Sequence, residues 1–148
     1  MKKVEILNLN NVLSKVKLNK LEKEVRDIVL ANHIATFKLA KEISSHLEEI
    51  KLKSFEGLEA EIALLQKYRA EYPTATEEVK LQLLEKAAND CPNIIAAEQS
   101  ANDFADKFLN EELEVELTKM THSDFIEMCV ASDIDITPTD IDKYEFLF

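Results

Sequence analysis

Apolar side chains recur at steps of three and four between about residue 19 and residue 110. This spacing places them on one face of an α-helix. The first run continues from about Asn19 to Tyr72, and Pro73 ends it because proline disfavours helix at the preceding residue. Two further helices are predicted over about 75–89 and 92–110. The last carries a narrow seam typical of a helix that packs on another helix, so we expect it to return antiparallel to the first.

The first of these helices is unusually long. At 1.5 Å per residue, a straight helix over this run would reach about 80 Å, far more than the size of a compact chain of this length. Two solutions are open. The helix either continues as one arm of a hairpin or breaks near Lys53–Gly57, where the only glycine lies and the apolar spacing drifts to steps of four. We favour one long helix, and whether it bends at Gly57 stays open.

The two ends of the chain show a different pattern. Apolar and polar residues alternate over Lys3–Leu7, Leu113–Leu117 and Asp133–Ile136, which predicts three short strands. Short helices are expected after each, the first with Asn8 as its N-cap and the last starting at Thr137-Pro138. The predicted fold is therefore α+β, mostly α, in one domain over 1–148. A long helical hairpin (20–110) projects from a small base of short strands and helices formed by both ends (1–19 plus 111–148).

Composition narrows the function classes. One glycine in 148 residues cannot supply a phosphate-binding loop, a dinucleotide motif or a nucleophile elbow. A net charge of −11 argues against direct binding of nucleic acid or an anionic membrane. No apolar run reaches the ~18 residues that span a bilayer, and the polar N-terminal residues do not form a secretion signal. We therefore expect a cytoplasmic protein.

The net charge is unevenly distributed. Residues 1–53 have a balance of +4, residues 54–110 of −6 and residues 111–148 of −9. One interpretation, which we prefer, is that the basic and acidic ends fold against each other. The other is that the acidic end meets a basic partner.

The sequence contains few groups suited to chemistry. Cys91 and Cys129 are too few for a disulfide scaffold, and we interpret them as reduced thiols, although a bridge between them stays open. His122 and Cys129 lie seven residues apart, but a zinc site needs three or four ligands. The acidic residues after position 132 resemble a calcium loop, yet Pro138 stands where such a loop requires glycine. We expect no metal, no cofactor, no small-molecule substrate and no enzyme activity.

The predicted hairpin offers candidate interaction residues instead. A two-helix arm that cannot bury its whole apolar face alone tends to pack on a partner helix. The candidate interaction or oligomerisation residues are Leu58, Ile62, Leu65, Phe104 and Phe108.

Both chain ends carry stretches with a further implication. They are MKKVEILNLNNVLSKVKL, VRDIVLANHIATFKLAKEISSHLEEI, FADKFLNEELEVELTKMTHSDF and DIDITPTDIDKYEFLF. The matching features are Ala35, Lys38–Lys41 and Ile43, the acidic run Glu112–Leu117, and Ile136–Ile141. Together they resemble a family of small phage and prophage proteins of unknown function, whereas residues 54–92 match poorly. The resemblance implies a phage-encoded context and brings no catalytic residues.

The expected function is a non-enzymatic phage or prophage protein that acts by protein–protein contact, as a virion structural component or an assembly factor. Its partner would be a second copy of the chain or a phage structural protein, in the host cytoplasm or in the virion. The alternative is an acidic inhibitor or decoy that occupies a basic site on a host nucleic-acid-binding protein.

Overall fold

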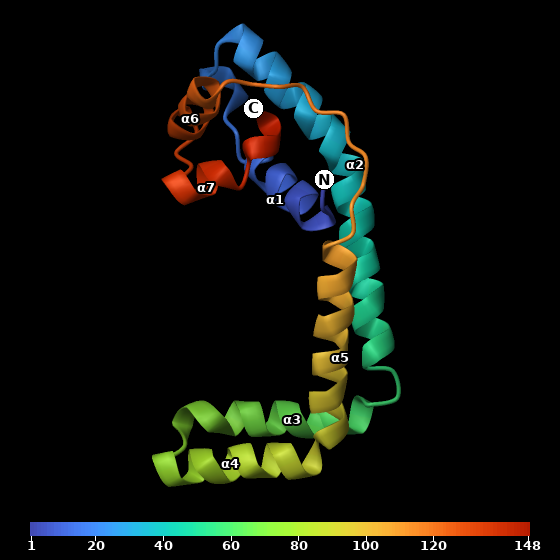
Figure 1. Ribbon diagram of the computed structural model, residues 1–148. Coiled ribbons are helices and arrows are strands. Elements are labelled where there is room, and N and C mark those ends of the chain that lie inside the picture. The colour runs from blue at the N-terminus through green and yellow to red at the C-terminus, as the bar shows by residue number, and fades with distance from the viewer. The chain divides into compact units, whose positions relative to one another are not determined.

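The computed structural model describes residues 1–148 and is built from helices without a β-sheet (Figure 1). The only β-type pairing is an isolated antiparallel bridge between Lys2 and Glu112. The predicted α+β class is therefore wrong, and the fold is all-α. Its elements are α1 (Lys3–Leu13), η1 (Leu18–Lys20), α2 (Lys23–Ser54), α3 (Glu59–Glu71), η2 (Tyr72–Thr74), α4 (Glu77–Asp90), α5 (Pro92–Leu109), α6 (His122–Ala131), α7 (Pro138–Asp142) and η3 (Glu145–Leu147), where η marks a 3-10 helix.

The chain divides into two compact units. Unit 1 contains Met1–Ser45 together with Phe108–Phe148, and unit 2 contains the contiguous stretch His46–Lys107. Helices α2 and α5 each contribute residues to both units. The division into a base and a hairpin within one domain stays a prediction.

The unbroken helix predicted from about residue 19 to residue 72 does not form. Helix α2 ends at Ser54 and α3 begins at Glu59. Gly57 lies between them at φ +79°, in the left-handed region that favours glycine. The break near Lys53–Gly57, the alternative that the spacing left open, is thus confirmed.

The first predicted strand is a helix. Over Lys3–Leu7 alone, alternating apolar residues fit a strand, but the buried residues of α1 include Ile6, Leu9 and Leu13, at steps of three and four. This longer pattern matches one helical face packed on the core of unit 1. Asn8, predicted as an N-cap, lies inside the helix because α1 already begins at Lys3.

The second predicted strand lies in what we call the extended segment, residues 113–118. Leu113, Val115 and Leu117 are half-buried and Glu114 and Glu116 are exposed, so the predicted alternation of faces is present. No neighbouring strand pairs with residues 114–117, and for that reason no sheet forms. Figure 1 shows this orange segment running alongside α2.

The third predicted strand, Asp133–Ile136, does not form: the chain turns at Ser132 and Asp133, and residues 134–136 have no regular secondary structure. Asp133 adopts φ +57°, and the Ile134 N–H donates to the carbonyl oxygen of Cys129 at 2.9 Å. The chain therefore reverses after α6, and Ile134 and Ile136 pack against the core as partly buried side chains. The predicted helix start at Thr137-Pro138 is confirmed, but α7 ends at Asp142 and the short η3 follows.

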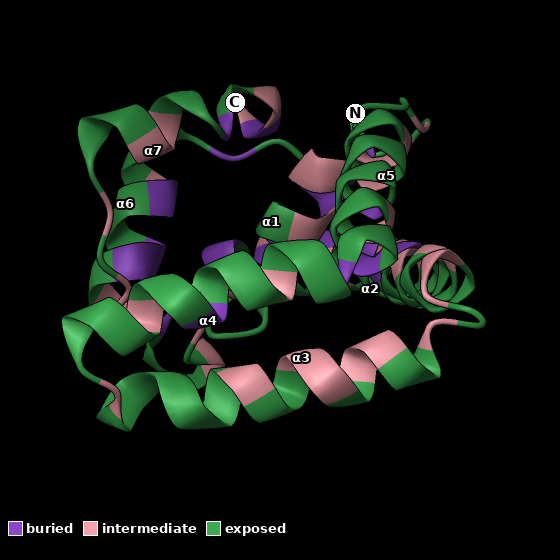
Figure 2. Cartoon of the chain, turned by 90° about the horizontal axis from the view of Figure 1, so that it is seen from below, coloured by how far each residue is buried: buried purple, intermediate pink, exposed green.

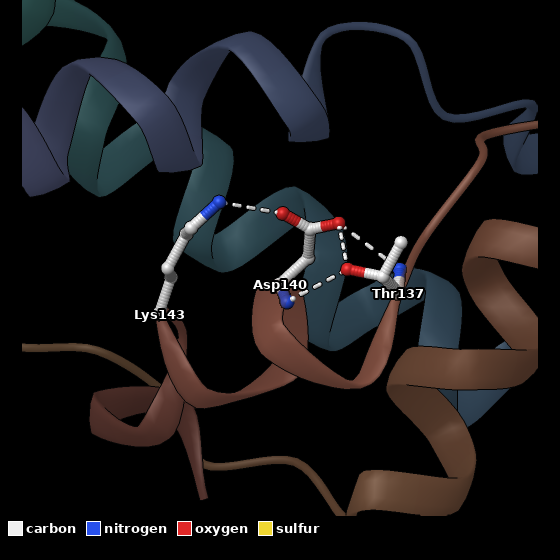
Figure 3. A network of polar contacts seen from close by, with 3 residues as sticks. All are labelled: Thr137, Asp140 and Lys143. Carbon is white, nitrogen blue, oxygen red and sulfur yellow. Dashed lines mark hydrogen bonds and ion pairs between the residues drawn. The ribbon is translucent and has the colours of Figure 1, made fainter.

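A polar network fixes the start of α7 (Figure 3). One oxygen of Asp140 accepts from the Thr137 N–H at 3.0 Å and from its hydroxyl at 2.7 Å. The other oxygen accepts from the Lys143 ammonium at 2.7 Å. The bond from Lys143, followed by those from Thr137, lowers the pKa of Asp140 from 3.8 to about 2, because all of them favour the charged carboxylate.

This network predicts an acid-dependent step. Because the folded pKa of Asp140 lies below its unfolded value, its contribution to stability is present above about pH 4 and is lost as the pH falls towards 2. An NMR titration of the Asp140 carboxyl carbon should give a midpoint near pH 2. In the Lys143→Gln variant the midpoint should move up towards 3.8. A midpoint near 3.8 in the unmodified protein would contradict the network.

The core of unit 1 is formed by α1, the first part of α2, α6 and the C-terminal residues (Figure 2). Phe125 is fully buried, with its ring 5.3 Å from that of Tyr144 and 5.8 Å from that of Phe148, measured between centroids. Such aromatic packing adds to the stabilisation by burial. The buried members of the core are Leu9, Leu13, Leu21, Val25, Val29, Met120, Phe125, Met128, Cys129, Tyr144 and Leu147.

Unit 2 has a much smaller interior. Its buried apolar side chains are Leu83, Cys91, Ile94 and Ala101, and α3 has no buried residue at all. Figure 2 accordingly shows α3 and α4 almost entirely in the colours of exposed and half-buried residues. Two short helices with so little buried surface are weakly stabilised by their own packing.

Candidate functional site

The five predicted interaction residues are divided between the two units. Leu58, Ile62 and Leu65 lie at the start of α3 and along it, all half-buried in unit 2. Phe104 on α5 also belongs to unit 2 and is 58% exposed. Phe108 belongs to unit 1, where the Lys3 ammonium lies 3.6 Å from the centre of its ring. The structure therefore brings the three α3 positions together and places Phe108 in a cation–π contact of its own.

Two open hollows border α3. One, of about 330 Å³, lies between α3 and α4 and is lined mainly by apolar and aromatic side chains, including Leu65, Tyr68, Tyr72, Leu83 and Leu84. The other, of about 240 Å³, is lined among others by Phe55, Ile62, Leu65 and Ile94. Leu65 lines both hollows and Ile62 lines the second, which also has the charged side chains of Lys51, Arg69 and Glu98 in its lining.

Further apolar side chains of unit 2 are exposed on the other helices. Val79 and Leu84 of α4 are 41% and 55% exposed. Leu81 lies two positions before Leu83, on a different face of α4, and is exposed as well. The exposed large apolar residues of unit 2 are Leu52, Tyr72, Val79, Leu81, Leu84, Ile95 and Phe104.

Polar contacts hold α3 to the start of α5. The Glu61 carboxylate accepts from the Ile94 N–H at 3.1 Å and from the Asn93 side-chain amide at 2.6 Å. A carboxylate is favourable there because the first N–H groups of a helix lack partners within the helix. The Tyr68 hydroxyl donates to Asp90 at 2.6 Å, and this bond is the main reason that the pKa of Tyr68 is raised to about 12. These are contacts that fix the packing of helices within unit 2.

The His and Cys side chains considered for chemistry lie in different surroundings and do not form a metal-binding group. The His122 ring stacks on Phe148 at 3.8 Å between centroids, while Cys129 is fully buried and its pKa is raised to about 11 by burial. Burial also raises the pKa of Cys91, and both thiols are free. Because their pKa values are raised, both thiols are poor nucleophiles at neutral pH. No three His, Cys, Asp or Glu side chains are grouped so that they could hold a metal ion.

None of the helices combines the length and the apolar character needed to cross a lipid bilayer. Comparison of the chain with models of protein families, with curated proteins and with solved structures gave no match.

Proposed function

We propose that this chain is a non-enzymatic phage or prophage protein that acts by protein–protein contact, as a virion component or an assembly factor. Unit 2 is its contact surface, and the partner is a second copy of the chain or a phage structural protein. The phage context rests on the resemblance of both chain ends, and the contact surface rests on the apolar side chains of unit 2.

The observation that carries this proposal is the imbalance between buried and exposed apolar residues in unit 2. Four apolar side chains are buried there, whereas seven large ones are exposed. Large exposed apolar patches are typical of protein interfaces, and the proposal is that these side chains contribute to one. Partner helices that cover the exposed apolar residues of α4 and α5 would stabilise these helices, whose own packing is weak.

Light scattering after size-exclusion chromatography tests self-association. We expect the unmodified protein to elute as a dimer or larger species, and the Leu84→Asp and Phe104→Asp variants to shift towards the monomer. Val130→Asp is the matched control, because Val130 is 68% exposed on α6 in unit 1 and should leave the assembly unchanged. Self-association through unit 2 would be refuted if the unmodified protein stays monomeric at high concentration and none of the three substitutions changes its elution.

A second candidate function is an acidic inhibitor that occupies a basic site on a host protein. Two ion pairs, Lys3–Glu111 and Lys17–Asp133, join the basic N-terminal region to the acidic C-terminal region. Other exposed carboxylates of that region have no ion-pair partner, among them Glu112, Glu114 and Glu116. Binding through this surface would weaken as salt is added, and a dissociation constant independent of salt would contradict it.

A further inference from the structure

The N-terminal residues pair with the start of the extended segment as two antiparallel strands would. The Leu113 N–H donates to the Met1 carbonyl oxygen at 2.7 Å, and the Met1 amino group donates to the Leu113 carbonyl oxygen at 2.9 Å. The Lys3 N–H donates to the Glu111 carbonyl oxygen at 3.0 Å, and Lys2 lies opposite Glu112. Met1 and Leu113 thus form a hydrogen-bonded pair of an antiparallel ladder.

The extended segment continues beyond this pairing. In an extended chain, backbone groups of alternate residues point to the same edge, so those of Val115 and Leu117 share the edge that Leu113 presents to Met1. Neither residue has a backbone hydrogen bond. The opposite edge behaves differently: the Thr118 N–H and carbonyl are both bound by the Asn32 side chain of α2, at 2.7 and 2.9 Å. One edge is therefore held by α2, and the other is open.

A groove lies beside this part of the segment. Its volume is about 470 Å³, and it is lined by Met1 and residues 112–116. This volume is within the range of binding pockets for small ligands and side chains, about 300–1,000 Å³. The groove borders Met1 and the part of the segment that includes Val115, so a strand added beside Val115 would lie in it.

The charge of the segment identifies what such a strand must carry. Glu114 and Glu116 are exposed on the face where Glu112 already has a lysine opposite it, and opposite charges facing each other across strands are stabilising. A second copy of the extended segment would place glutamate opposite glutamate, which is destabilising. The fitting occupant is an extended segment of another protein in which Lys or Arg alternates with apolar residues.

We propose that the open edge at Val115 and Leu117 is a docking site for such a basic, extended polypeptide segment, which binds by adding an antiparallel strand. Unpaired strand edges are known templates for this kind of binding. The proposal deepens the second candidate function and rests on its acidic surface, because it assigns a basic extended strand as the partner of Glu114 and Glu116. It does not depend on self-association through unit 2.

The test uses the full-length protein and the peptide acetyl-Val-Lys-Val-Lys-Val-amide. Hydrogen exchange followed by NMR should show slowed exchange of the Val115 and Leu117 amides when the peptide is added, with little change at Glu114 and Glu116. N-methylation of the peptide's valines should abolish binding, because their N–H groups face the open edge. N-methylation of its lysines, whose N–H groups face away, should leave binding intact. Equal effects of the two modifications would overturn the proposal.

Charge variants distinguish binding by strand addition from nonspecific electrostatic attraction of the peptide to the acidic protein. The double change Glu114→Lys and Glu116→Lys should weaken peptide binding about tenfold, from two reversed cross-strand pairs. Glu127→Lys with Glu145→Lys makes the same change in net charge on exposed positions elsewhere in unit 1, and should have a much smaller effect. Equal weakening by the two double variants, or absence of binding by the unmodified protein, would refute the docking site. Either result leaves the light-scattering test of unit 2 unaffected.

Discussion

Replacement of Phe125 by alanine is expected to lower the free energy of unfolding of unit 1 by about 3–5 kcal/mol. The Phe125 side chain has no exposed surface and lies between the rings of Tyr144 and Phe148. Its removal would leave a cavity where α6 meets the C-terminal residues, and the surrounding aromatic rings would lose their contacts. Because small proteins are stable by only about 5–15 kcal/mol, much of unit 1 would then unfold at moderate urea concentrations.

Urea denaturation followed by NMR measures this effect. The Tyr144 ring signals report on unit 1, whereas Tyr68 and Tyr72 report on unit 2. Val130→Ala on the same helix is the control, since Val130 is mostly exposed and its truncation should cost less than about 0.5 kcal/mol. A loss below about 1 kcal/mol for Phe125→Ala would mean that the aromatic cluster is not the centre of this core.

Replacement of Asn32 by alanine is expected to lower stability by about 1–3 kcal/mol. The buried Asn32 amide donates to the Thr118 carbonyl oxygen and accepts from the Thr118 N–H, so one side chain replaces the two bonds that a neighbouring strand would supply. Without it, the extended segment would have no backbone hydrogen bond between Leu113 and Met120. Hydrogen exchange of the Thr118 amide should accelerate accordingly.

Thr36→Val provides the matched control. Thr36 is also buried on α2, but its hydroxyl donates only to carbonyl oxygens of its own helix, those of Asn32 and His33. The change to valine keeps the shape and should leave the Thr118 amide protected. If Asn32→Ala and Thr36→Val accelerate exchange at Thr118 equally, the Asn32 bridge is not what holds the segment.

Two helices of the chain middle, α4 and α5, were predictable with their ends because their signals are local. Helix α5 was expected over about 92–110 and spans Pro92–Leu109, and α4 was expected over about 75–89 and spans Glu77–Asp90. The capping residue of α7, Thr137, was recognisable because its bonds to Asp140 involve neighbours in sequence. Gly57 also marked a real break, since only glycine adopts positive φ without strain.

The predicted strands failed because alternation over four or five residues does not provide a partner. Leu113–Leu117 has the face pattern of a strand, but whether it joins a sheet depends on what lies beside it, and here that is a helix. At Lys3–Leu7 the alternation coincided with positions that a helix also buries. In both segments, tertiary packing determined the secondary structure and local alternation did not.

The structure places the candidate interaction residues without testing whether they bind a partner. Ile62 and Leu65 line hollows of unit 2, whereas Phe108 belongs to unit 1. Periodicity identifies an apolar face and cannot say which neighbour covers it. The exposed apolar residues of α4 illustrate this, because a face left open has the same spacing as a buried one.

The pairing of Met1 with Leu113 has a consequence for the order in which the chain folds. These residues are 112 positions apart, and the core of unit 1 also needs Leu147. Closing so long a loop is slow, because the chain loses conformational entropy before the contact between the two ends compensates for that loss. Unit 2 is contiguous, so its helices can form while the chain is still being synthesised. The helices of unit 2 therefore do not depend on the C-terminal residues that complete unit 1.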